Sequence, residues 1–349
     1  MKVKKATIRD VAKKAEVSIA SVSLILKGAG KFAEPTIRKV WAAVNELQYR
    51  PNPYARKIFA GEAAEHRPTQ LLMRIGYRPS DVPLQNDLHN LLTCSFNEAC
   101  AQYGYFGVNY LYRHELGFRN SLLLNDLVDG VVLGTHHREV IESIRGRVPA
   151  VLVNVNMNPE TVKMPLVMPD FEPCFRSAFE TLSQRGYPPE IAILRGYDSQ
   201  IKNSVILDLD RLSRPMECAR TALGLCKGKK YIHDLDISSR NPAEGLEKAA
   251  DWIACMVKRE NIRIFTLLQI GPVEELIARL NRRGIRLPED AVIVKPDYWA
   301  KDLPGTIQIH VDREKLMGKA VELLIGMIEK QEIGNREYLV PCRKIQINF

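Results

Sequence analysis

From about residue 70 onward, short apolar runs alternate with segments in which apolar residues recur at helical spacing. The runs are LLMRIGY, YFGVNYLY, VDGVVLG, AVLVNVN, IAILRG, IRIFTLL and AVIVKP. Helices are expected between them, near residues 87–103, 137–145, 171–185, 243–260, 272–283 and 313–330. Parallel strands need crossover connections, so this alternation predicts parallel sheets that helices cover on both faces. The fold class expected for this part of the chain is α/β.

The excess positive charge lies entirely in the first part of the chain. The 349 residues carry a formal net charge of +9. Residues 1–61 contain 13 Lys and Arg against 4 Asp and Glu, and the remainder holds 37 of each kind. A compact basic segment on a neutral body is typical of polyanion binding, because neutralised phosphates release their counterions. A solvated basic surface with no partner is the alternative that charge alone leaves open.

The seven cysteines are widely scattered, and none falls in a CxxC pair. This pattern disfavours zinc ligation and a disulfide framework, so we expect buried free thiols, no metal and no cofactor. The start MKVKKATIRD offers no apolar segment for a signal peptide. No run approaches the roughly 18 apolar residues that a membrane helix needs. These features predict a soluble, cytoplasmic protein that does not use a membrane.

Three short amphipathic helices are expected in the basic segment. The first begins after Thr7, which can form a capping box with Asp10, and its apolar face is Ile8, Val11, Ala12 and Ala15. After a tight turn, Ser18 caps a second helix that runs from residue 19 to about residue 26. The third has Pro35 in its first turn and an apolar face of Ile37, Val40, Trp41, Val44 and Leu47. This pattern predicts an all-α helix-turn-helix head.

The segment YRPNPYARKIFAG predicts one further helix of about two turns. Asn52 can cap it, Pro53 suits its first position and Gly61 suits its end. Because a helix of this length is not stable alone in water, it needs a partner surface, which DNA could supply. A frayed linker helix is the alternative in the absence of DNA.

The stretch ATIRDVAKKAEVSIASVSLILKG…TIRKVWAAVNELQYRPNPYARKI resembles the headpiece and hinge of the lactose-repressor/galactose-repressor (LacI/GalR) family of bacterial transcription regulators over about 55 residues. The resemblance implies a repressor, dimeric on double-stranded operator DNA with an inverted repeat. Its second helix would enter the major groove, and the hinge helices of a homodimer would pair in the minor groove. The implied domains are a head (1–49), a hinge helix (50–61), a linker (62–69) and an effector-binding and dimerisation core (70–349).

The resemblance also assigns roles to individual residues. Contacts with the DNA backbone would come from Thr7, Ser18, Ser21, Ser23, Thr36 and Tyr49. The base-reading positions hold Ile19, Ala20 and Leu24. The hinge positions are Asn52, Ala55, Arg56 and Ile58, of which Ile58 replaces the leucine that usually wedges between base pairs.

The base-reading positions depart from the family, which normally carries polar side chains there. A bidentate hydrogen bond to a base is worth about 1–3 kcal/mol of discrimination, and apolar side chains cannot make one. Ile19, Ala20 and Leu24 can touch only thymine methyls and other apolar edges. DNA binding is therefore expected without an exacting, guanine-reading specificity, while Val22 and Ile25 are expected to point into the core.

For the body, the resemblance implies two Rossmann-like subdomains joined by three crossovers, as in periplasmic sugar-binding proteins. A small-molecule effector would lie at the carboxyl ends of the strands, in the cleft between the subdomains. The candidate effector residues are Asn86, His89, Arg214, Gln269 and Asp297. Gln269 and Ile270 replace an Asn-Asp pair that usually faces a sugar, which removes a charged acceptor and adds an apolar wall. We expect an atypical sugar or an acidic metabolite; a degenerate pocket that senses nothing is the alternative.

Motifs of enzymes are missing or incomplete. KGAGK is too short for a phosphate loop, GTHHRE lacks the spacing of a metal-binding helix, and there is no GxSxG or Gly-rich dinucleotide fingerprint. HDLDIS, with His233, Asp234 and Asp236, is expected to be a loop with solvated carboxylates. The sequence therefore predicts a protein that is not an enzyme, with an enzyme on a periplasmic-binding-protein-like fold as the alternative.

Overall fold

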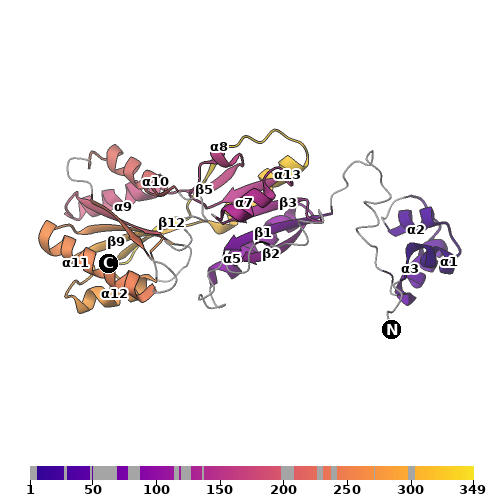
Figure 1. Ribbon diagram of the computed structural model, residues 1–349, viewed down its shortest axis with the longest axis horizontal. Helices are drawn as coiled ribbons and strands as arrows, with labels where there is room; N and C mark the ends of the chain where they lie inside the picture. Colours follow the sequence, from indigo (N-terminus) through magenta and orange to yellow (C-terminus); the bar gives the residue numbers. More distant parts are fainter. Residues whose placement is uncertain are drawn as a thin grey trace. The chain divides into compact units, whose positions relative to one another are not determined.

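The computed structural model describes residues 6–26, 30–47, 49, 69–77, 87–113, 118, 127–135, 137–197, 208–225, 231–236, 242–270, 272–297 and 303–349. The chain divides into two compact units, Met1–Thr69 and Gln70–Phe349 (Figure 1). The predicted hinge helix at residues 50–61 lies outside the described residues. The finer division into head, hinge helix, linker and core therefore stays a prediction.

The first unit contains three helices in its described part: α1 (Ile8–Ala15), α2 (Ile19–Leu26) and α3 (Glu34–Glu46). Their buried faces form one small core of Val11, Ala12, Ala15, Val22, Ile25, Val40, Ala43 and Val44. The predicted place of Trp41 in this core is wrong, because its side chain is 46% exposed. Successive residues of a helix differ by about 100° in direction, so Trp41 lies at the margin of the face that Val40 and Val44 define.

The second unit contains two six-stranded sheets. Sheet 1 has the order β11-β5-β4-β3-β1-β2, and its strands are β1 (Leu71–Tyr77), β2 (Phe106–Tyr112), β3 (Gly130–Gly134), β4 (Ala150–Val153), β5 (Leu166–Asp170) and β11 (Glu337–Pro341). Sheet 2 has the order β12-β10-β9-β8-β6-β7, and its strands are β6 (Ile191–Tyr197), β7 (Tyr231–Asp236), β8 (Ile264–Leu268), β9 (Val292–Asp297), β10 (Thr306–His310) and β12 (Lys344–Ile347). The strand pairs of both sheets are parallel except for β10 with β12.

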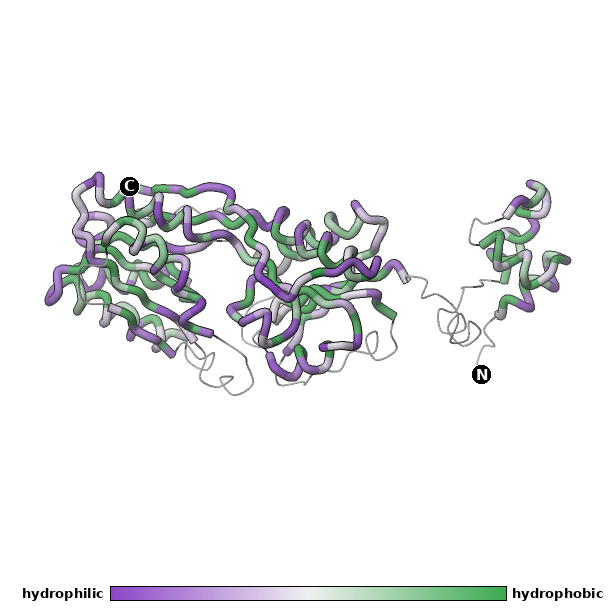
Figure 2. Tube along the Cα trace, turned by 90° about the horizontal axis from the view of Figure 1, so that it is seen from above, coloured by the Kyte–Doolittle hydropathy of each residue, from purple (hydrophilic) through white to green (hydrophobic). Residues whose placement is uncertain are grey.

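Helices cover both faces of each sheet. Around sheet 1 lie α5 (Asp87–Gln102), α7 (Arg138–Ile144), α8 (Pro159–Val162) and α13 (Arg313–Ile328). Around sheet 2 lie α9 (Glu172–Gln184), α10 (Leu209–Ala222), α11 (Pro242–Glu260) and α12 (Val273–Arg282). Figure 2 shows hydrophobic residues along the central strands of both sheets, where two apolar cores per sheet lie between strands and helices. This confirms the predicted α/β architecture of two parallel-sheet subdomains.

The chain passes between the two sheets three times, as predicted. It crosses after β5 into α9, returns after β10 into α13, and crosses again between β11 and β12. In folds of this kind, a small-molecule site is built from the loops that follow the carboxyl ends of the parallel strands.

Two expectations about side chains in this unit are wrong. The expected loop residues His233, Asp234 and Asp236 do not stand in a loop, because residues 231–236 are the edge strand β7 of sheet 2. The thiols are not all buried either: Cys100 is buried, but Cys94 and Cys218 are exposed on the outer sides of α5 and α10. Helices carry residues on all sides, so an apolar residue type alone does not place its side chain inward.

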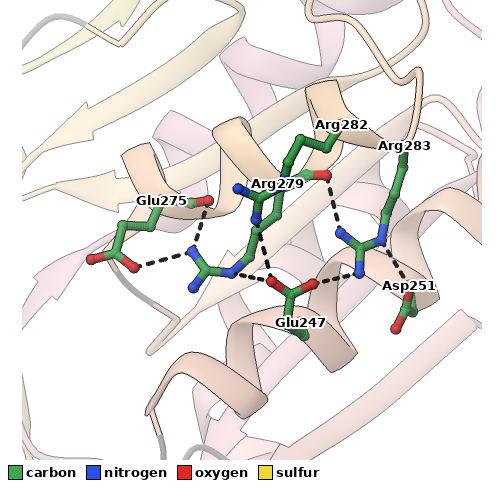
Figure 3. A network of polar contacts seen from close by, with 6 residues as sticks. All are labelled: Glu247, Asp251, Glu275, Arg279, Arg282 and Arg283. Carbon is green, nitrogen blue, oxygen red and sulfur yellow. Dashed lines mark hydrogen bonds and ion pairs between the residues drawn. The ribbon is translucent and has the colours of Figure 1, made fainter.

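An ionic network joins α11 and α12 on the outside of sheet 2 (Figure 3). Glu247 on α11 accepts hydrogen bonds from Arg279 Nε at 2.9 Å and from Arg283 Nη2 at 2.6 Å. Arg283 Nε also donates to Asp251 Oδ1 at 2.8 Å. The two helices thus hold each other by charge as well as by their apolar faces. Among the helices of the described ranges, none is long and apolar enough to cross a membrane.

Candidate nucleic-acid interface and small-molecule site

The first helix of the head begins with the capping box that its sequence predicts. Thr7 Oγ1 donates to Asp10 Oδ2 at 2.7 Å, and the Asp10 backbone N–H donates back to Thr7 Oγ1 at 3.4 Å. The helix ends at Glu16, whose φ of 58° is left-handed and whose backbone N–H donates to Ala12. This tight turn sends the chain directly into α2, which gives the helix-turn-helix geometry.

The second helix is apolar on two sides. Val22 and Ile25 are buried in the head core, as predicted. Away from this core Ile19 is 45% exposed, Leu24 is 40% exposed and Ala20 is exposed as well. Exposed large apolar side chains on so small a unit mark a contact surface rather than a core. The described structure thus leaves the three predicted base-reading side chains open to a partner.

The polar candidates of the head lie around this helix. Ser18 Oγ accepts from the Ser21 backbone N–H at 3.0 Å and lies 2.9 Å from Ser21 Oγ, so both hydroxyls sit at the start of α2. Ser23 and Thr36 are partly exposed, and Tyr49 packs against the head core. The hinge candidates Asn52, Ala55, Arg56 and Ile58 lie outside the described residues.

The basic side chains of the head divide into paired and unpaired ones. Lys14 pairs with Glu46, while Arg38 lies 3.2 Å from Glu34 and Lys39 lies 3.7 Å from Glu16. By contrast, Arg9 and Lys13 are exposed on α1 and contact no carboxylate in the described part of the chain. They are four residues apart and therefore share one side of the helix. Counting net charge could not separate these two from the rest.

Two of the five candidate effector residues lie at the same edge of sheet 2. Asp297 is the last residue of β9, and Gln269 directly follows β8, its parallel neighbour. Gln269 is exposed and has a left-handed φ of 58°. The neighbouring Ile270 does not form an apolar wall at this edge, because its side chain packs into the core between sheet 2, α11 and α12.

Of the other three candidates, the two that the structure describes lie on helices and not at that edge. Asn86 lies outside the described residues, and His89 belongs to the first turn of α5, which follows β1 of sheet 1. Arg214 is exposed on α10. Six residues on, Arg220 is buried, and its Nε has no hydrogen-bond partner among the described residues. The assignment of all five residues to an effector site stays a proposal.

A buried arginine in β6 is the centre of a polar cluster in sheet 2. Arg195 Nε and Nη2 donate to the two carboxylate oxygens of Asp234 in β7, at 2.6 and 2.9 Å. Its Nη1 donates to Asp210 Oδ1 of α10 at 3.0 Å. Burial lowers the pKa of Arg195, but the hydrogen bonds to Asp234 and Asp210 raise it by more, so the net shift is upward. The supposed loop carboxylate Asp234 is therefore half of a bidentate ion pair.

Sheet 1 holds a second buried arginine, Arg74 in β1, which is 2% exposed. Sequence reasoning passed over both arginines because each stands inside an apolar run, LLMRIGY or IAILRG. A charged residue within a run that reads as a buried strand was the signal that could have found them, since such charges are rarely buried without a partner.

Comparisons with known proteins agree with this geometry. The family model described as "Bacterial regulatory proteins, lacI family" matches residues 7–52. The HTH-type transcriptional repressor PurR of Aliivibrio fischeri is 23% identical over 95% of this chain and 95% of its own. Catabolite control protein A of Staphylococcus xylosus is 24% identical over 97% of both chains.

One of the similar solved structures is a lac repressor dimer bound to operator and the anti-inducer ONPF. It has a TM-score of 0.69, shares 20% sequence identity and is covered over 97% of both chains. At that identity the likeness shows the fold. The curated relatives named above extend over nearly the same length as this chain, so the match includes both the head and the two-sheet unit.

Proposed function

Because this chain belongs to the LacI family of bacterial regulatory proteins, we propose that it represses transcription by binding operator DNA through its helix-turn-helix head. The observation that carries the proposal is α2, which buries Val22 and Ile25 and leaves Ile19, Ala20 and Leu24 exposed. A helix anchored on one side and open on the other can enter a major groove without disturbing the core.

The regulator acts as a homodimer on an inverted-repeat operator of about 16–20 base pairs, because two heads related by a two-fold axis read two half-sites. The PurR and lac repressor relatives, the second solved as a dimer on its operator, support this assembly. The paired hinge helices of residues 50–61, with Ile58 as the wedge, remain part of the proposal. A protein that regulates transcription works beside the chromosome, so we place it in the cytoplasm.

The unit of residues 70–349 senses a small molecule and carries out no catalysis. Its relatives are regulators, and one similar structure was solved with a bound anti-inducer. Parallel α/β sheets bind ligands at the carboxyl ends of their strands, where Gln269 and Asp297 lie. An effector changes DNA binding only if it binds two conformations of this unit with different affinities.

The test compares apolar side chains that are equally exposed on different helices. An operator is first selected from random duplexes, and binding is measured by fluorescence anisotropy. Ile19→Ala with Leu24→Ala is expected to reduce the ratio of operator to random-DNA affinity about tenfold, because apolar contacts with base edges are lost. Trp41→Ala, at 46% exposure on α3, is the matched control and should leave the ratio unchanged. Equal loss in both variants, or no selected operator, would overturn the proposal.

Contacts with the DNA backbone are tested separately, through the salt dependence of the affinity. Arg9→Ala with Lys13→Ala should weaken operator and random DNA alike and reduce the slope of log affinity against log salt by about 2. Arg38→Ala is the control, because that side chain already pairs with Glu34 at 3.2 Å. An unchanged slope in the double variant would show that α1 does not face phosphates.

A further inference from the structure

Arg74 lies inside sheet 1 and extends toward the carboxyl end of β1. Its strand neighbour on the same face, Leu72, packs with Phe96 of α5 in the core between the sheet, α5 and α13. A β-carbon at Gly76 would lie 3.3 Å from Arg74 Nη2. The guanidinium therefore lies against Gly76, one residue before β1 ends at Tyr77. The missing side chain of Gly76 makes room for it.

The charge of Arg74 has no counter-ion in the described part of the chain. Its one side-chain hydrogen bond there runs from Nη1 to Asn109 Oδ1 of β2 and is long, at 3.5 Å. Asn109 in turn donates from Nδ2 to Asn97 Oδ1 of α5 at 3.2 Å. Both partners are neutral amides. Burial lowers the pKa of Arg74 to about 10, so the side chain still carries its charge at neutral pH.

Burying a charge without a partner costs several kcal/mol, so native proteins pair such groups. The equivalent group in sheet 2 shows the usual solution, because Arg195 binds two carboxylates. At Arg74 the position that corresponds to Asp234 is occupied by Asn109: each is the residue directly across from the arginine on the edge strand.

A second source of positive potential lies at the same end of β1. The 16-residue helix α5 follows β1 and packs on β1 and β2, so its N-terminus lies at the carboxyl end of the strand. The first backbone N–H groups of a helix and its dipole favour an anion. Arg74 and this helix end therefore both favour a negative group at the edge of sheet 1, where ligands of parallel sheets bind.

We propose that the effector carries an acidic group, a carboxylate or a phosphate ester, and that Arg74 is the residue that binds it. The planar guanidinium offers two parallel N–H donors, which match either group. This inference rests on the proposed function, since it names the chemical class of the molecule that the regulator senses. Arg74 was not among the positions to which the family resemblance pointed.

The test measures thermal unfolding of the full chain with inorganic phosphate or with succinate, against sodium chloride at equal ionic strength. Hydrogen exchange over residues 71–77 and 91–102 reports where each anion acts. We expect one of the two anions to raise the melting temperature and to protect these residues, and the better anion tells phosphate esters from carboxylates. Protection confined to residues 6–49 would mean that the anion binds only the basic head, which would overturn the inference.

Two variants remove the site in different ways. Arg74→Met deletes the charge, and Asn109→Asp supplies an internal counter-ion, as Asp234 does for Arg195. Both should weaken the anion response about tenfold or more, since a charge-assisted pair is lost. Arg138→Met, an exposed arginine of α7 that lies 3.6 Å from Glu142, is the control and should respond as the wild type does. If Arg74→Met does not fold, Asn109→Asp alone decides.

The two proposals fail separately. Wild-type protein that binds its operator, yet gains no more stability from either anion than from chloride, overturns the anion inference and leaves the proposed function intact. An undiminished response in Asn109→Asp also overturns it. Protein that responds through Arg74 but binds no DNA overturns the proposed function instead.

Discussion

The two sheets of the second unit treat a buried arginine in opposite ways. In sheet 2, Arg195 of β6 lies opposite Asp234 on the edge strand β7 and also forms an ion pair with Asp210 of α10. In sheet 1, Arg74 of β1 faces the neutral Asn109 across the edge strand β2. The fold around them is the same: a central strand, an edge strand on one side, and the helix that follows the central strand above it.

The difference shows what a fold fixes and what it leaves to the sequence. Similar backbones place both guanidinium groups near strand ends. Whether the charge has a counter-ion within the protein depends on the edge strand, which carries the carboxylate Asp234 in sheet 2 and the amide Asn109 in sheet 1. A satisfied charge stabilises the subdomain and is closed to ligands, whereas an unsatisfied one costs stability and attracts an anion. Sheet 2 therefore uses its arginine for stability, and sheet 1 keeps its arginine for binding.

The largest effect is expected where the satisfied charge is broken. Asp234→Asn should lower the free energy of unfolding by about 1–3 kcal/mol, because two charge-assisted hydrogen bonds to a buried guanidinium are lost. Urea denaturation followed by circular dichroism measures it. Asp210→Asn is the matched control: Asp210 also pairs with Arg195, but its side chain is 94% exposed against 39% for Asp234, so the change should be within about 0.5 kcal/mol. Equal losses would mean that burial does not decide the value of these pairs.

The reverse change should stabilise sheet 1. Asn109→Asp should raise the free energy of unfolding by about 0.5–1.5 kcal/mol at neutral pH, because the buried charge of Arg74 gains a counter-ion. The new carboxyl group would have a lowered pKa in the folded state. Its contribution is therefore full above its unfolded pKa of about 3.9 and is lost as the pH falls through the folded value. Urea denaturation at pH 7 and at pH 3 measures it, and a gain of equal size at both would rule out the ion pair.

Much of this fold follows from local pattern. Apolar runs predicted seven strands, and helical spacing with good caps predicted the head, because both signals depend on residues close in sequence. Two of the strands that were missed, β10 and β7, carry polar residues whose partners are distant in sequence. In β10, for example, buried Gln308 accepts a hydrogen bond from Asn348 at 2.7 Å. In β7, HDLD forms a strand because its backbone pairs with β6, which also brings Asp234 to Arg195, 39 residues earlier in the chain.

The candidate sites divide in the same way. The exposed side chains of α2 were predicted from the family resemblance and not from helical spacing, since exposed Ile19 stands only three residues before buried Val22. The sequence could not show which of Arg74 and Arg195 has a carboxylate partner. Only the register between β1 and β2, and between β6 and β7, shows which residue lies opposite each of them. Ile270 was misplaced for a related reason: sequence adjacency to Gln269 did not reveal that its side chain turns into the core.

A smaller effect is expected at Gly76, which leaves room for the guanidinium of Arg74. In Gly76→Ala the new β-carbon would lie 3.3 Å from Arg74 Nη2 and 3.4 Å from Leu111 Cδ2, so the guanidinium must shift by a few tenths of an ångström. In sodium chloride, we expect the free energy of unfolding to change by about 0.5 kcal/mol or less. The gain in melting temperature from the anion should shrink. Gly134→Ala at the end of β3, where the nearest contact is 3.7 Å, is the control. Equal anion responses in the two variants would show that the Arg74 geometry does not matter.

The smallest effect is expected on the helix pairs outside the two sheets, which differ as the arginines do. The pair α5 and α13 on sheet 1 meets through apolar side chains such as Phe96 and Leu316, whereas α11 and α12 on sheet 2 also share the Glu247 network. The hydrogen bond from Arg283 lowers the pKa of Glu247, as does the charge of Arg279.

A lowered carboxyl pKa stabilises the folded state above the ordinary glutamate pKa of about 4.3, and this contribution is lost as the pH falls through the lowered value. Acid should therefore speed hydrogen exchange in α11 and α12 relative to α5 and α13, after correction for the intrinsic exchange rates at each pH. Because the Glu247 side chain is 42% exposed, the change is expected to be small. Glu247→Gln should remove the pH dependence of this difference, whereas Glu180→Gln on α9, an exposed position outside the network, should keep it. If acid speeds hydrogen exchange equally in both helix pairs, the ionic network does not stabilise α11 and α12.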